Sequence, residues 1–590
     1  MHPRAIASCC VSRRASRLTT WLASLLRYAQ SRSSAITVRT TRSILHCSMR
    51  SGIHRAGSLP TAQWSCHVTK RTTHRHLDMS ASVSGACLHA AGAAAFRVEC
   101  LIGRGLPRVQ LVGLPDLAAR ETKERLPAAF EHCGLNFPKS RVLFNLVPAQ
   151  LPKRGFPLDL ALATSLLVAS HQVPPPGAPL LTVAELDLAG QLRPVPRGVL
   201  LAARTARASG AVLCVAPADL AEAQLLPGVR VVAPPSLRAW VHALRGNHLP
   251  APHPQPRKKH STARSAQLDE VRGQEHARQA AILAAAGRHS LLLQGPPGTG
   301  KSLLARKVAR LLPTLDDEQA LQLACLESLH GPVPALPQQA PFRAPHHTTS
   351  PQALLGGGRP VRPGELSRAH GGVLFLDEFP EFARPALEGL RQPLEEHEVR
   401  IERTQESACF PAHVLLIAAR NPCPCGYATH PHRACHCTPA AVQRYARRTS
   451  GPLLDRFDLF AEMGPVAPEL LQGPPSPPTD DDAAQALQAA SKVQAKRKTA
   501  QGWARSARAQ QDQITAAGIS SDARQLWERA AREQHWSGRA VLRVLRVART
   551  IADCAGEQTI HRHHLLQAVA FRPPHDLSSP PVSPAPSATD

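Results

Sequence analysis

The sequence predicts an α/β protein in which two domains of alternating strands and helices precede a helical C-terminal part. Strand-like and helix-like stretches alternate from Val83 to about Gly246, and again from about Leu268 to Met463. A Pro/Asp-rich break at 473–482 then separates the second alternating stretch from residues with helical spacing. We therefore expect a parallel sheet in the second stretch and a helical domain after it.

Length and composition limit the possible classes of protein. A chain of 590 residues exceeds one hydrophobic core, and typical domain sizes predict roughly three or four folded units. The formal net charge of +27 suggests a polyanionic partner, but residues 1–77 contain no Asp or Glu, so much of this charge belongs to a basic leader. No run of about 18 apolar residues occurs, which argues against a membrane-spanning helix and favours a cytoplasmic protein with reduced thiols.

The composition also predicts domain boundaries. The leader over residues 1–78 fits either an organelle transit peptide or upstream sequence before a start at Met79, and we favour the start at Met79 because the alternating pattern begins directly after it. If it is translated, we expect the leader to be disordered. We further expect an α/β domain at 79–246, a linker at 247–267, a second α/β domain at 268–472 with a Cys-rich loop at 421–438, a helical lid domain at 483–571 and a disordered tail at 572–590.

A phosphate-binding loop follows the first strand of the second α/β domain. Ser290–Gln294 is typical of a buried strand and Leu303–Leu312 has helical spacing. Between them the loop contains Gly295, Pro296, Pro297, Gly298, Thr299, Gly300, Lys301 and Ser302. In this P-loop pattern backbone N–H groups surround phosphate oxygens, Lys301 reaches the β- and γ-phosphates, and Ser302 ligates Mg²⁺. We expect ATP and Mg²⁺ here, and the weaker alternative is a Gly-rich turn with an incidental lysine.

Two further predicted strands end in polar residues suited to ATP hydrolysis. The strand at 372–376 ends at Asp377, which can hold Mg²⁺ through water, and Glu378, which can act as general base. The strand at 414–418 precedes Asn421, which can orient the attacking water as a sensor 1 residue. The alternatives are solvated acids at a strand end and a turn-forming Asn before Pro422.

Two arginines are candidates for contacts with the γ-phosphate. Arg456 lies between acids in an apolar stretch, where it is either an arginine finger for a neighbouring subunit or a salt-bridged surface residue. Ser537 can cap a helix with one apolar face, and Arg539 in its first turn is a candidate sensor 2 residue. A finger that acts on an adjacent copy requires a ring of identical subunits.

Five segments are specific to one protein family, and they are Phe342–Thr348, Gly356–Gly358, Arg362–Ser367, Asn421–Gly426 and Val547–Asp553. With the elements above in AAA+ order, they closely resemble the YifB/ComM family of magnesium-chelatase-like ATPases from about Met79 to Phe571. The resemblance implies an AAA+ P-loop parallel sheet with a C-terminal helical lid. Arg420 departs from the family pattern, in which an apolar residue usually precedes the sensor Asn.

The resemblance extends to the N-terminal domain through Gly105–Pro107, Val112–Pro115 and Leu151–Gly155. In this family the domain resembles the Lon protease domain, an α/β fold like domain 2 of ribosomal protein S5. The chain has no Gly-Pro-Ser-Ala-Gly segment of the kind that carries the Lon nucleophile. We therefore expect this domain to bind or gate rather than to hydrolyse peptides.

The resemblance also implies a homo-hexameric DNA helicase that promotes branch migration during natural transformation and recombination. The alternatives are a magnesium-chelatase-type motor subunit and a regulatory ATP-binding scaffold. The chain lacks an Asp-x-Ser-x-Ser metal-adhesion segment, which weakens the first alternative, and it has Glu378, which weakens the second.

A cysteine cluster is a candidate metal site. Cys423, Cys425, Cys435 and Cys437 form two Cys-x-Cys pairs that can close a tetrahedral Zn²⁺ site. We favour zinc over free cysteines in a Pro-rich loop, with one of the histidines in the loop as a possible substitute for one sulfur. These histidines are His430, His432 and His436.

Basic residues and a histidine pair are candidate DNA contacts. The basic residues at 492–508 can either form a solvated face or follow DNA phosphates, and they are Lys492, Lys496, Arg497, Lys498, Arg505 and Arg508. By resemblance, the insert with His346 and His347 can face a central pore, although packing or capping roles are equally plausible for the pair.

Overall fold

The computed structural model contains two compact units, Met1–Met79 and Ser80–Asp590. The structure describes three strands of the first unit and, in the second, residues 83–89, 92–113, 118–151, 153–246, 267–358, 361–403, 407–474, 476–501 and 518–572. Most of the expected linker, the tail after Arg572, and Arg505 and Arg508 lie outside the described residues.

The leader unit contains an antiparallel sheet where the sequence predicted no fold. Its strands pair in the order β1 (Ile36–Arg39), β2 (Ile44–Met49) and β3 (Trp64–Thr69).

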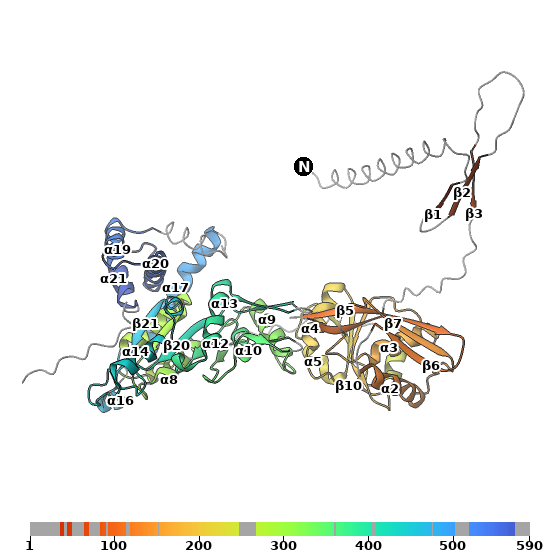
Figure 1. Ribbon diagram of the computed structural model, residues 1–590, viewed down its shortest axis with the longest axis horizontal. Helices are drawn as coiled ribbons and strands as arrows, with labels where there is room; N and C mark the ends of the chain where they lie inside the picture. Colours follow the sequence, from red (N-terminus) through yellow and green to blue (C-terminus); the bar gives the residue numbers. More distant parts are fainter. Residues whose placement is uncertain are drawn as a thin grey trace, which may run out of the picture. The chain divides into compact units, whose positions relative to one another are not determined.

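The N-terminal α/β domain is built on a mixed sheet of seven strands in the order β12-β11-β8-β4-β5-β7-β6 (Figure 1). The pairs from β12 to β4 are parallel, β5 is antiparallel to both β4 and β7, and β6 is parallel to β7. The strands are β4 (Val83–His89), β5 (Gly92–Gly103), β6 (Arg108–Val112), β7 (Arg141–Val147), β8 (Leu180–Val183), β11 (Val212–Val215) and β12 (Arg230–Val232). A short antiparallel pair, β9 (Glu185–Leu186) and β10 (Leu192–Arg193), lies outside this sheet.

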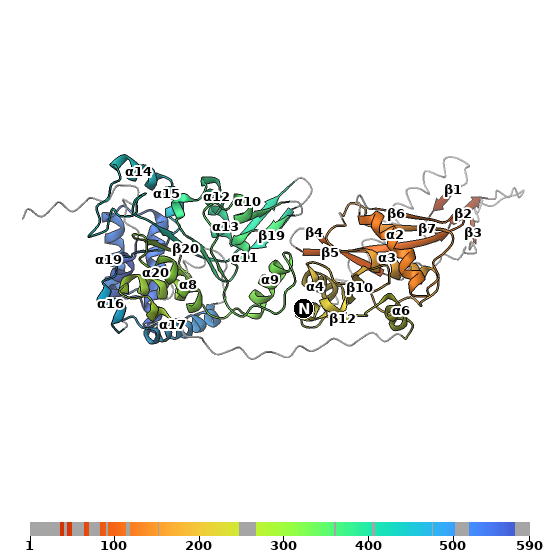
Figure 2. The same ribbon diagram turned by 90° about the horizontal axis from the view of Figure 1, so that it is seen from below.

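Helices cover both faces of this sheet. One apolar core combines β5 and β7 with α2, α3 and α6, and a second core combines β4 and β8 with α4. Figure 2 labels these helices beside the strands of the sheet. Nine residues of α3 are buried, because the helix is apolar around nearly its whole circumference. The helices are α2 (Ala118–His132), α3 (Asp159–Ala169), α4 (Val199–Ser209), η1 (Pro217–Asp219), α5 (Leu220–Ala223) and α6 (Leu237–Arg245).

The second α/β domain contains five parallel strands in the order β14-β17-β20-β13-β21. The strands are β13 (Leu291–Gln294), β14 (Phe342–Arg343), β17 (Val373–Leu376), β20 (Leu415–Arg420) and β21 (Leu459–Glu462). Alternate residues of the central strands enter two different apolar cores, as Leu291 and Leu292 do. Both faces are therefore buried, which explains why these strands are apolar runs without alternation.

Helices and two small hairpins complete this domain. Its helices are η2 (Leu268–Glu270), α7 (Glu275–Gly287), α8 (Lys301–Leu311), α9 (Asp317–Ser328), α10 (Pro351–Leu355), α11 (Glu365–Arg368), η3 (Phe379–Glu381), α12 (Arg384–Gly389), α13 (Arg391–Glu396), α14 (Pro439–Arg447), α15 (Gly451–Leu454) and α16 (Pro468–Gln472). The hairpins pair β15 (Gly356–Gly357) with β16 (Arg362–Pro363), and β18 (Glu398–Glu402) with β19 (Ser407–Pro411). Two α/β domains and a parallel sheet confirm the predicted fold class.

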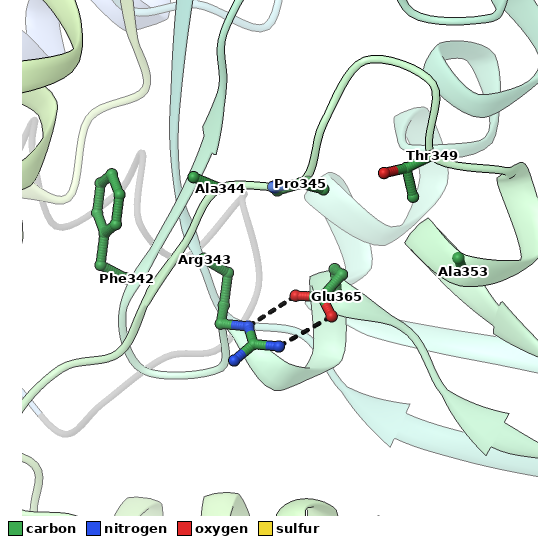
Figure 3. Close-up of a pocket in the computed structure, with 7 residues that line it drawn as sticks. All are labelled: Phe342, Arg343, Ala344, Pro345, Thr349, Ala353 and Glu365. Atoms are coloured by element: carbon green, nitrogen blue, oxygen red, sulfur yellow. Dashed lines mark hydrogen bonds and ion pairs between the residues drawn. The ribbon is translucent and has the colours of Figure 1, made fainter.

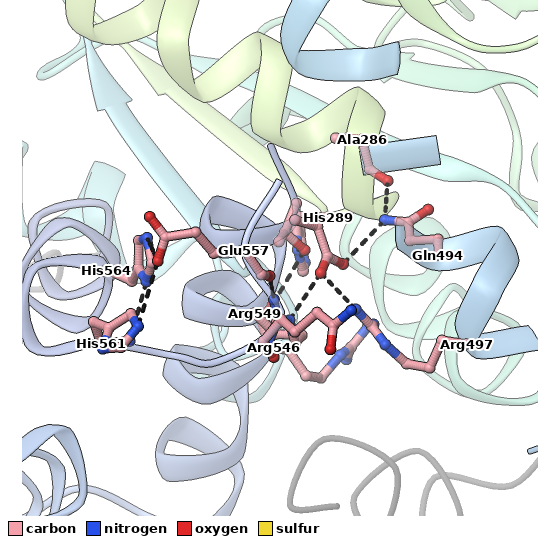
Figure 4. A network of polar contacts seen from close by, with 12 residues as sticks. Ala286, His289, Gln494, Arg497, Arg546, Arg549, Glu557, His561 and His564 are labelled. Atoms are coloured by element: carbon pink, nitrogen blue, oxygen red, sulfur yellow. Dashed lines mark hydrogen bonds and ion pairs between the residues drawn. The ribbon is translucent and has the colours of Figure 1, made fainter. Parts of the chain in front are cut away.

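The C-terminal lid consists of α17 (Asp480–Gln501), α19 (Ser521–Glu533), α20 (Gly538–Cys554) and α21 (Arg562–Ala570). The Ser537 side chain caps α20 by accepting a hydrogen bond from the N–H of Ala540. Asp553 of α20 accepts hydrogen bonds from Arg549 of the same helix and from Arg497 of α17, within the polar network of Figure 4. This buried carboxylate therefore joins two helices of the lid.

Candidate nucleotide-binding site

The glycine-rich loop joins β13 to α8. A Cβ on Gly295 would lie 2.1 Å from the carbonyl oxygen of Met463, so the close approach of these backbones requires glycine. Gly298 and Gly300 have φ angles of 81° and 91°, in the left-handed region. The chain then enters α8, whose first N–H groups have no acceptors within the helix and favour an anion. The loop therefore fits the phosphates of a nucleotide.

Lys301 points back into this loop. Its side-chain ammonium donates to the carbonyl oxygens of Gly295 and Pro296 at 2.7 and 2.8 Å, and to Oδ1 of Asn421 at 3.3 Å. Burial lowers the pKa of Lys301, whereas the two carboxylates that follow β17 raise it. The ammonium thus lies where phosphate oxygens can replace the carbonyl acceptors.

Ser302 and Asp377 form the oxygen pair expected to hold Mg²⁺. The Ser302 hydroxyl donates to Oδ2 of Asp377 at 2.6 Å, which brings the start of α8 to the end of β17. Hydroxyl and carboxylate oxygens are the ligand types that Mg²⁺ prefers. These two side chains therefore fit a magnesium ion between the P-loop and the sheet.

Glu378 has a histidine partner that sequence reasoning did not assign. Its carboxylate lies 3.0 Å from Nδ1 of His347, and its side chain is 53% exposed. His346 lies against His347, with ring centroids 4.1 Å apart. The sequence places His347 on an insert, but no local pattern links that insert to the end of β17.

Arg456 lies near the amino-terminal end of β13, whereas the P-loop follows the carboxyl-terminal end of that strand. Its carbonyl oxygen accepts a hydrogen bond from Ser290, which precedes β13, whereas the P-loop follows β13. A strand of four residues spans about 13 Å. The guanidinium donates to Glu395 at 2.7 Å and to the carbonyl oxygen of Arg391 at 3.3 Å. Arg456 is thus remote from the nucleotide site of its own chain.

Arg539 joins Arg456 at the same carboxylate. Its guanidinium lies 3.5 Å from Glu395 and its side chain is 62% exposed. Among the described residues, the structure therefore brings together Arg456 and Arg539 at one place, and Lys301 and Asn421 at another. Glu395 has no sequence signal that distinguishes it from a solvated acid.

Arg420 precedes the sensor position and is buried, at 4% exposed. Its carbonyl oxygen accepts the N–H of Gly295 at 3.2 Å, which fixes the start of the P-loop. Burial lowers the pKa of Arg420, and Tyr445 opposes this change.

The described part of the basic stretch lies on α17. Lys492 and Lys496 are exposed, whereas Arg497 pairs with Asp553 inside the lid. The four predicted zinc ligands also come together, with their sulfur atoms within 4.8 Å of one another.

A pocket of about 410 Å³ lies beside the loop with the histidine pair (Figure 3). Arg343 crosses it and donates to Glu365 at 2.6 and 2.9 Å. Hydrogen bonding to Glu365 raises the pKa of Arg343. The remaining lining residues are Phe342, Ala344, Pro345, Thr349 and Ala353.

The P-loop follows β13, which lies between β20 and β21, and the two acidic residues follow β17. Together with the helical lid, this arrangement defines an AAA+ protein. Three family models match the chain. Magnesium chelatase, subunit ChlI, matches residues 267–471, subunit ChlI of Mg-chelatase matches 98–219, and magnesium chelatase, subunit ChlI C-terminal, matches 479–572.

Individual magnesium-chelatase-like proteins are similar to this chain over most of its length. The uncharacterized protein YifB of Escherichia coli (strain K12) is 38% identical over 490 residues, which cover 80% of this chain and 93% of YifB. The competence protein ComM of Haemophilus influenzae is 38% identical over 494 residues, 80% of this chain and 94% of ComM. A shorter match of 54 residues at 50% identity joins the chain to the archaeal Lon protease of Pyrococcus abyssi, 5% of that protein. The chain belongs to the YifB/ComM family of magnesium-chelatase-like proteins.

No helix among the residues that the structure describes is long and apolar enough to cross a membrane.

Proposed function

We propose that the protein is a ring-forming ATPase, a hexamer in the cytoplasm, that couples ATP hydrolysis to movement along DNA and promotes branch migration during recombination. Membership of a magnesium-chelatase-like AAA+ family supports an ATPase motor. The P-loop geometry supports ATP as the nucleotide substrate with Mg²⁺ beside it.

Each residue of the site has a chemical task in this proposal. Lys301 and the loop N–H groups bind the phosphates, and Ser302 and Asp377 would hold Mg²⁺, which would neutralise negative charge on the triphosphate. Glu378 accepts the proton of the attacking water, and Asn421 orients that water. The γ-phosphoryl group still needs a cation from another source as charge develops on its oxygens.

The position of Arg456 carries the proposal of a ring. This residue is separated from its own P-loop by the length of β13, so it can act only on the site of an adjacent copy. Arg539 lies beside it and can enter the same neighbouring site. A closed ring gives every nucleotide site one such partner.

Two observations support DNA as the partner. The Haemophilus influenzae relative ComM is a competence protein. Lys492 and Lys496 are exposed on α17, where their ammonium groups can contact phosphates. A chelatase-type motor subunit is the second candidate, because residues 267–471 match the family of the magnesium chelatase subunit ChlI.

Strand displacement tests the proposal directly. Wild type is expected to unwind forked and four-way DNA with ATP, whereas Lys301→Ala and Glu378→Gln are expected to fail. Lys301→Ala should lose ATP binding, but Glu378→Gln should retain bound ATP in an assembled ring. If wild type hydrolyses ATP but DNA is neither unwound nor stimulatory, the DNA motor is refuted and the chelatase-type or scaffold function takes its place.

A further inference from the structure

Four cysteine side chains meet in the loop between β20 and α14. The sulfur of Cys423 lies 3.3 Å from that of Cys425 and 3.6 Å from that of Cys435, and the last two are 3.5 Å apart. Cys437 completes a group in which all four sulfurs lie within 4.8 Å. A disulfide requires an S–S distance of about 2.05 Å, so these are four separate thiols.

These sulfur distances suit a tetrahedral metal site. Zinc–sulfur bonds of about 2.3 Å place the sulfurs of a tetrahedron about 3.8 Å apart, slightly more than the observed distances. Sulfur donors select zinc over Mg²⁺ or Ca²⁺, which prefer oxygen. Because four protein ligands fill the coordination sphere, the site is suited to bracing the chain rather than to catalysis.

The loop needs a brace because little of it is packed. No helix or strand occurs at 421–438, and long loops of this kind are uncommon in compact domains. Cys423 is fully buried, whereas residues 431–434 are exposed. The backbone N–H of Ala428 donates to the sulfur of Cys423 at 3.3 Å, so the buried cysteine also fixes the chain that follows it.

The cysteine loop also packs against the nucleotide site. A Cβ on Gly426 would lie 2.6 Å from Cδ of Pro297 in the P-loop and 3.9 Å from Cγ of Asn421. Gly426 has a φ of 86°, and its N–H donates to the carbonyl oxygen of Cys423 at 3.0 Å. The cysteine group is therefore one tight turn away from both the P-loop and the sensor residue.

We propose that Cys423, Cys425, Cys435 and Cys437 bind one Zn²⁺ as thiolates, and that the ion holds the loop against the P-loop. The metal site stands on the sulfur geometry, and its effect on ATP turnover rests on the function proposed above. Each thiol that binds as thiolate releases its proton to solvent.

Elemental analysis of the full-length protein, purified without chelators, tests the metal site. Wild type should hold one zinc per chain, and Cys425→Ser and Cys435→Ser should each lose it. Cys409→Ser is the matched control, because Cys409 is an exposed thiol on β19. His563→Ala is the second control, because His563 belongs to the other described group of possible metal ligands, with Glu557 and His564. Both controls should keep the zinc.

Three results would overturn the site: wild type without zinc, zinc retained in Cys435→Ser, or iron with acid-labile sulfide in place of zinc. If the serine variants do not fold, Co²⁺ exchange into wild type replaces them as the test. Tetrahedral thiolate charge-transfer bands are expected after exchange, and their absence overturns the proposal equally.

ATP turnover separates the two parts of the proposal. Removal of zinc from wild type should lower kcat/KM for ATP at least about tenfold, and zinc re-addition should restore it. Unchanged turnover after complete zinc loss refutes the bracing role. A zinc-loaded wild type that hydrolyses no ATP refutes the ATPase function instead, because zinc content is measured without nucleotide.

Discussion

Glu378 has a backbone conformation that only its surroundings can maintain. Its φ of 49° lies in the left-handed region, which is costly for a residue with a side chain and is often found at functional sites. The side chain of His347 contacts its carboxylate at 3.0 Å. Glu378 is the general base in the proposed mechanism and must point at the attacking water, so we propose that His347 positions it.

His347→Ala tests this role. We expect kcat for ATP to fall by about tenfold to 100-fold, because a misplaced base transfers the proton poorly, while KM for ATP stays near the wild-type value. His132→Ala is the control, since His132 is exposed at the end of α2 in the N-terminal α/β domain. Steady-state ATPase kinetics measure both variants, and equal kcat values for the two would contradict the assignment.

The sequence predicts the positions of some site residues but not the contacts of others. The P-loop pattern is local, so Lys301 and Ser302 follow from a short segment with a known geometry. Asp377 and Asn421 follow two separate strands, and they approach Lys301 because the strands are neighbours in a parallel sheet. The contact between His347 and Glu378 depends on the path of a loop, which no periodicity or spacing encodes.

At the scale of elements, Asp458 links the sheet to the lid. It lies just before β21, and its carboxylate contacts His289 at 3.3 Å and Arg543 of α20 at 3.5 Å. Burial by itself raises the pKa of Asp458, but the hydrogen bond to His289 and the charges of Arg546 and Arg543 lower it to about 2. The carboxylate must therefore stay ionised for these contacts to persist.

This lowered pKa predicts a pH dependence of stability. A carboxylate whose pKa falls on folding stabilises the protein above its unfolded pKa of 3.8, and this contribution is lost as the pH falls toward about 2. The shift corresponds to about 2 kcal/mol of unfolding free energy. Asp458→Asn should lose about this amount at pH 7 and show a weaker decline between pH 4 and 2.

Urea unfolding at several pH values provides the measurement. Asp455→Asn is the control, because Asp455 is exposed on the same segment, and its effect should stay within about 0.5 kcal/mol. An Asp458→Asn protein with wild-type stability at pH 7 would show that this contact does not stabilise the fold.

A second link between elements joins the two α/β domains. Glu222 is 6% exposed, and its carboxylate accepts hydrogen bonds from the Ser328 hydroxyl at 2.6 Å, the N–H of Val333 at 3.1 Å and the N–H of Leu200 at 3.3 Å. Ser328 ends α9, so one buried side chain of the N-terminal domain receives donors from the second domain.

Glu222→Ala removes the acceptor and leaves these buried donors without a partner. The expected loss is about 3 kcal/mol of unfolding free energy, with earlier proteolysis near α9. Glu131→Ala, on an exposed position of the same domain, should change the stability little. Thermal denaturation and limited proteolysis measure both variants. Equal cleavage rates would contradict a coupling of the domains through Glu222.

Element boundaries follow from the sequence where capping residues are recognised. The sequence predicts the lid from residue 483, whereas α17 begins at Asp480. Thr479 and Asp482 exchange hydrogen bonds between backbone N–H groups and side-chain oxygens, which is the signature of a capping box. This pair could have located the helix start, but the run of acids around it resembles a solvated break.

At the scale of the whole molecule, the account depends on a nucleotide site shared by two copies of the chain. Lys301 and Glu378 lie at the carboxyl-terminal ends of the parallel strands, and Arg456 lies at their amino-terminal ends. There, Glu395 pairs with both Arg456 and Arg539. In the proposed site, one protomer therefore contains both halves but cannot combine them. Turnover should require assembly, and each half should be replaceable by a half from a different copy.

Mixing two inactive proteins tests this claim most directly. Arg456→Ala retains the binding half and Glu378→Gln retains the arginine half, so random rings of the two should regain ATPase activity at about a quarter of their interfaces. A mixture of Lys301→Ala with Glu378→Gln should stay inactive, because both changes damage the same half. Recovery in the first mixture alone is the predicted result. No recovery from a mixture shown to form joint rings would contradict the shared site.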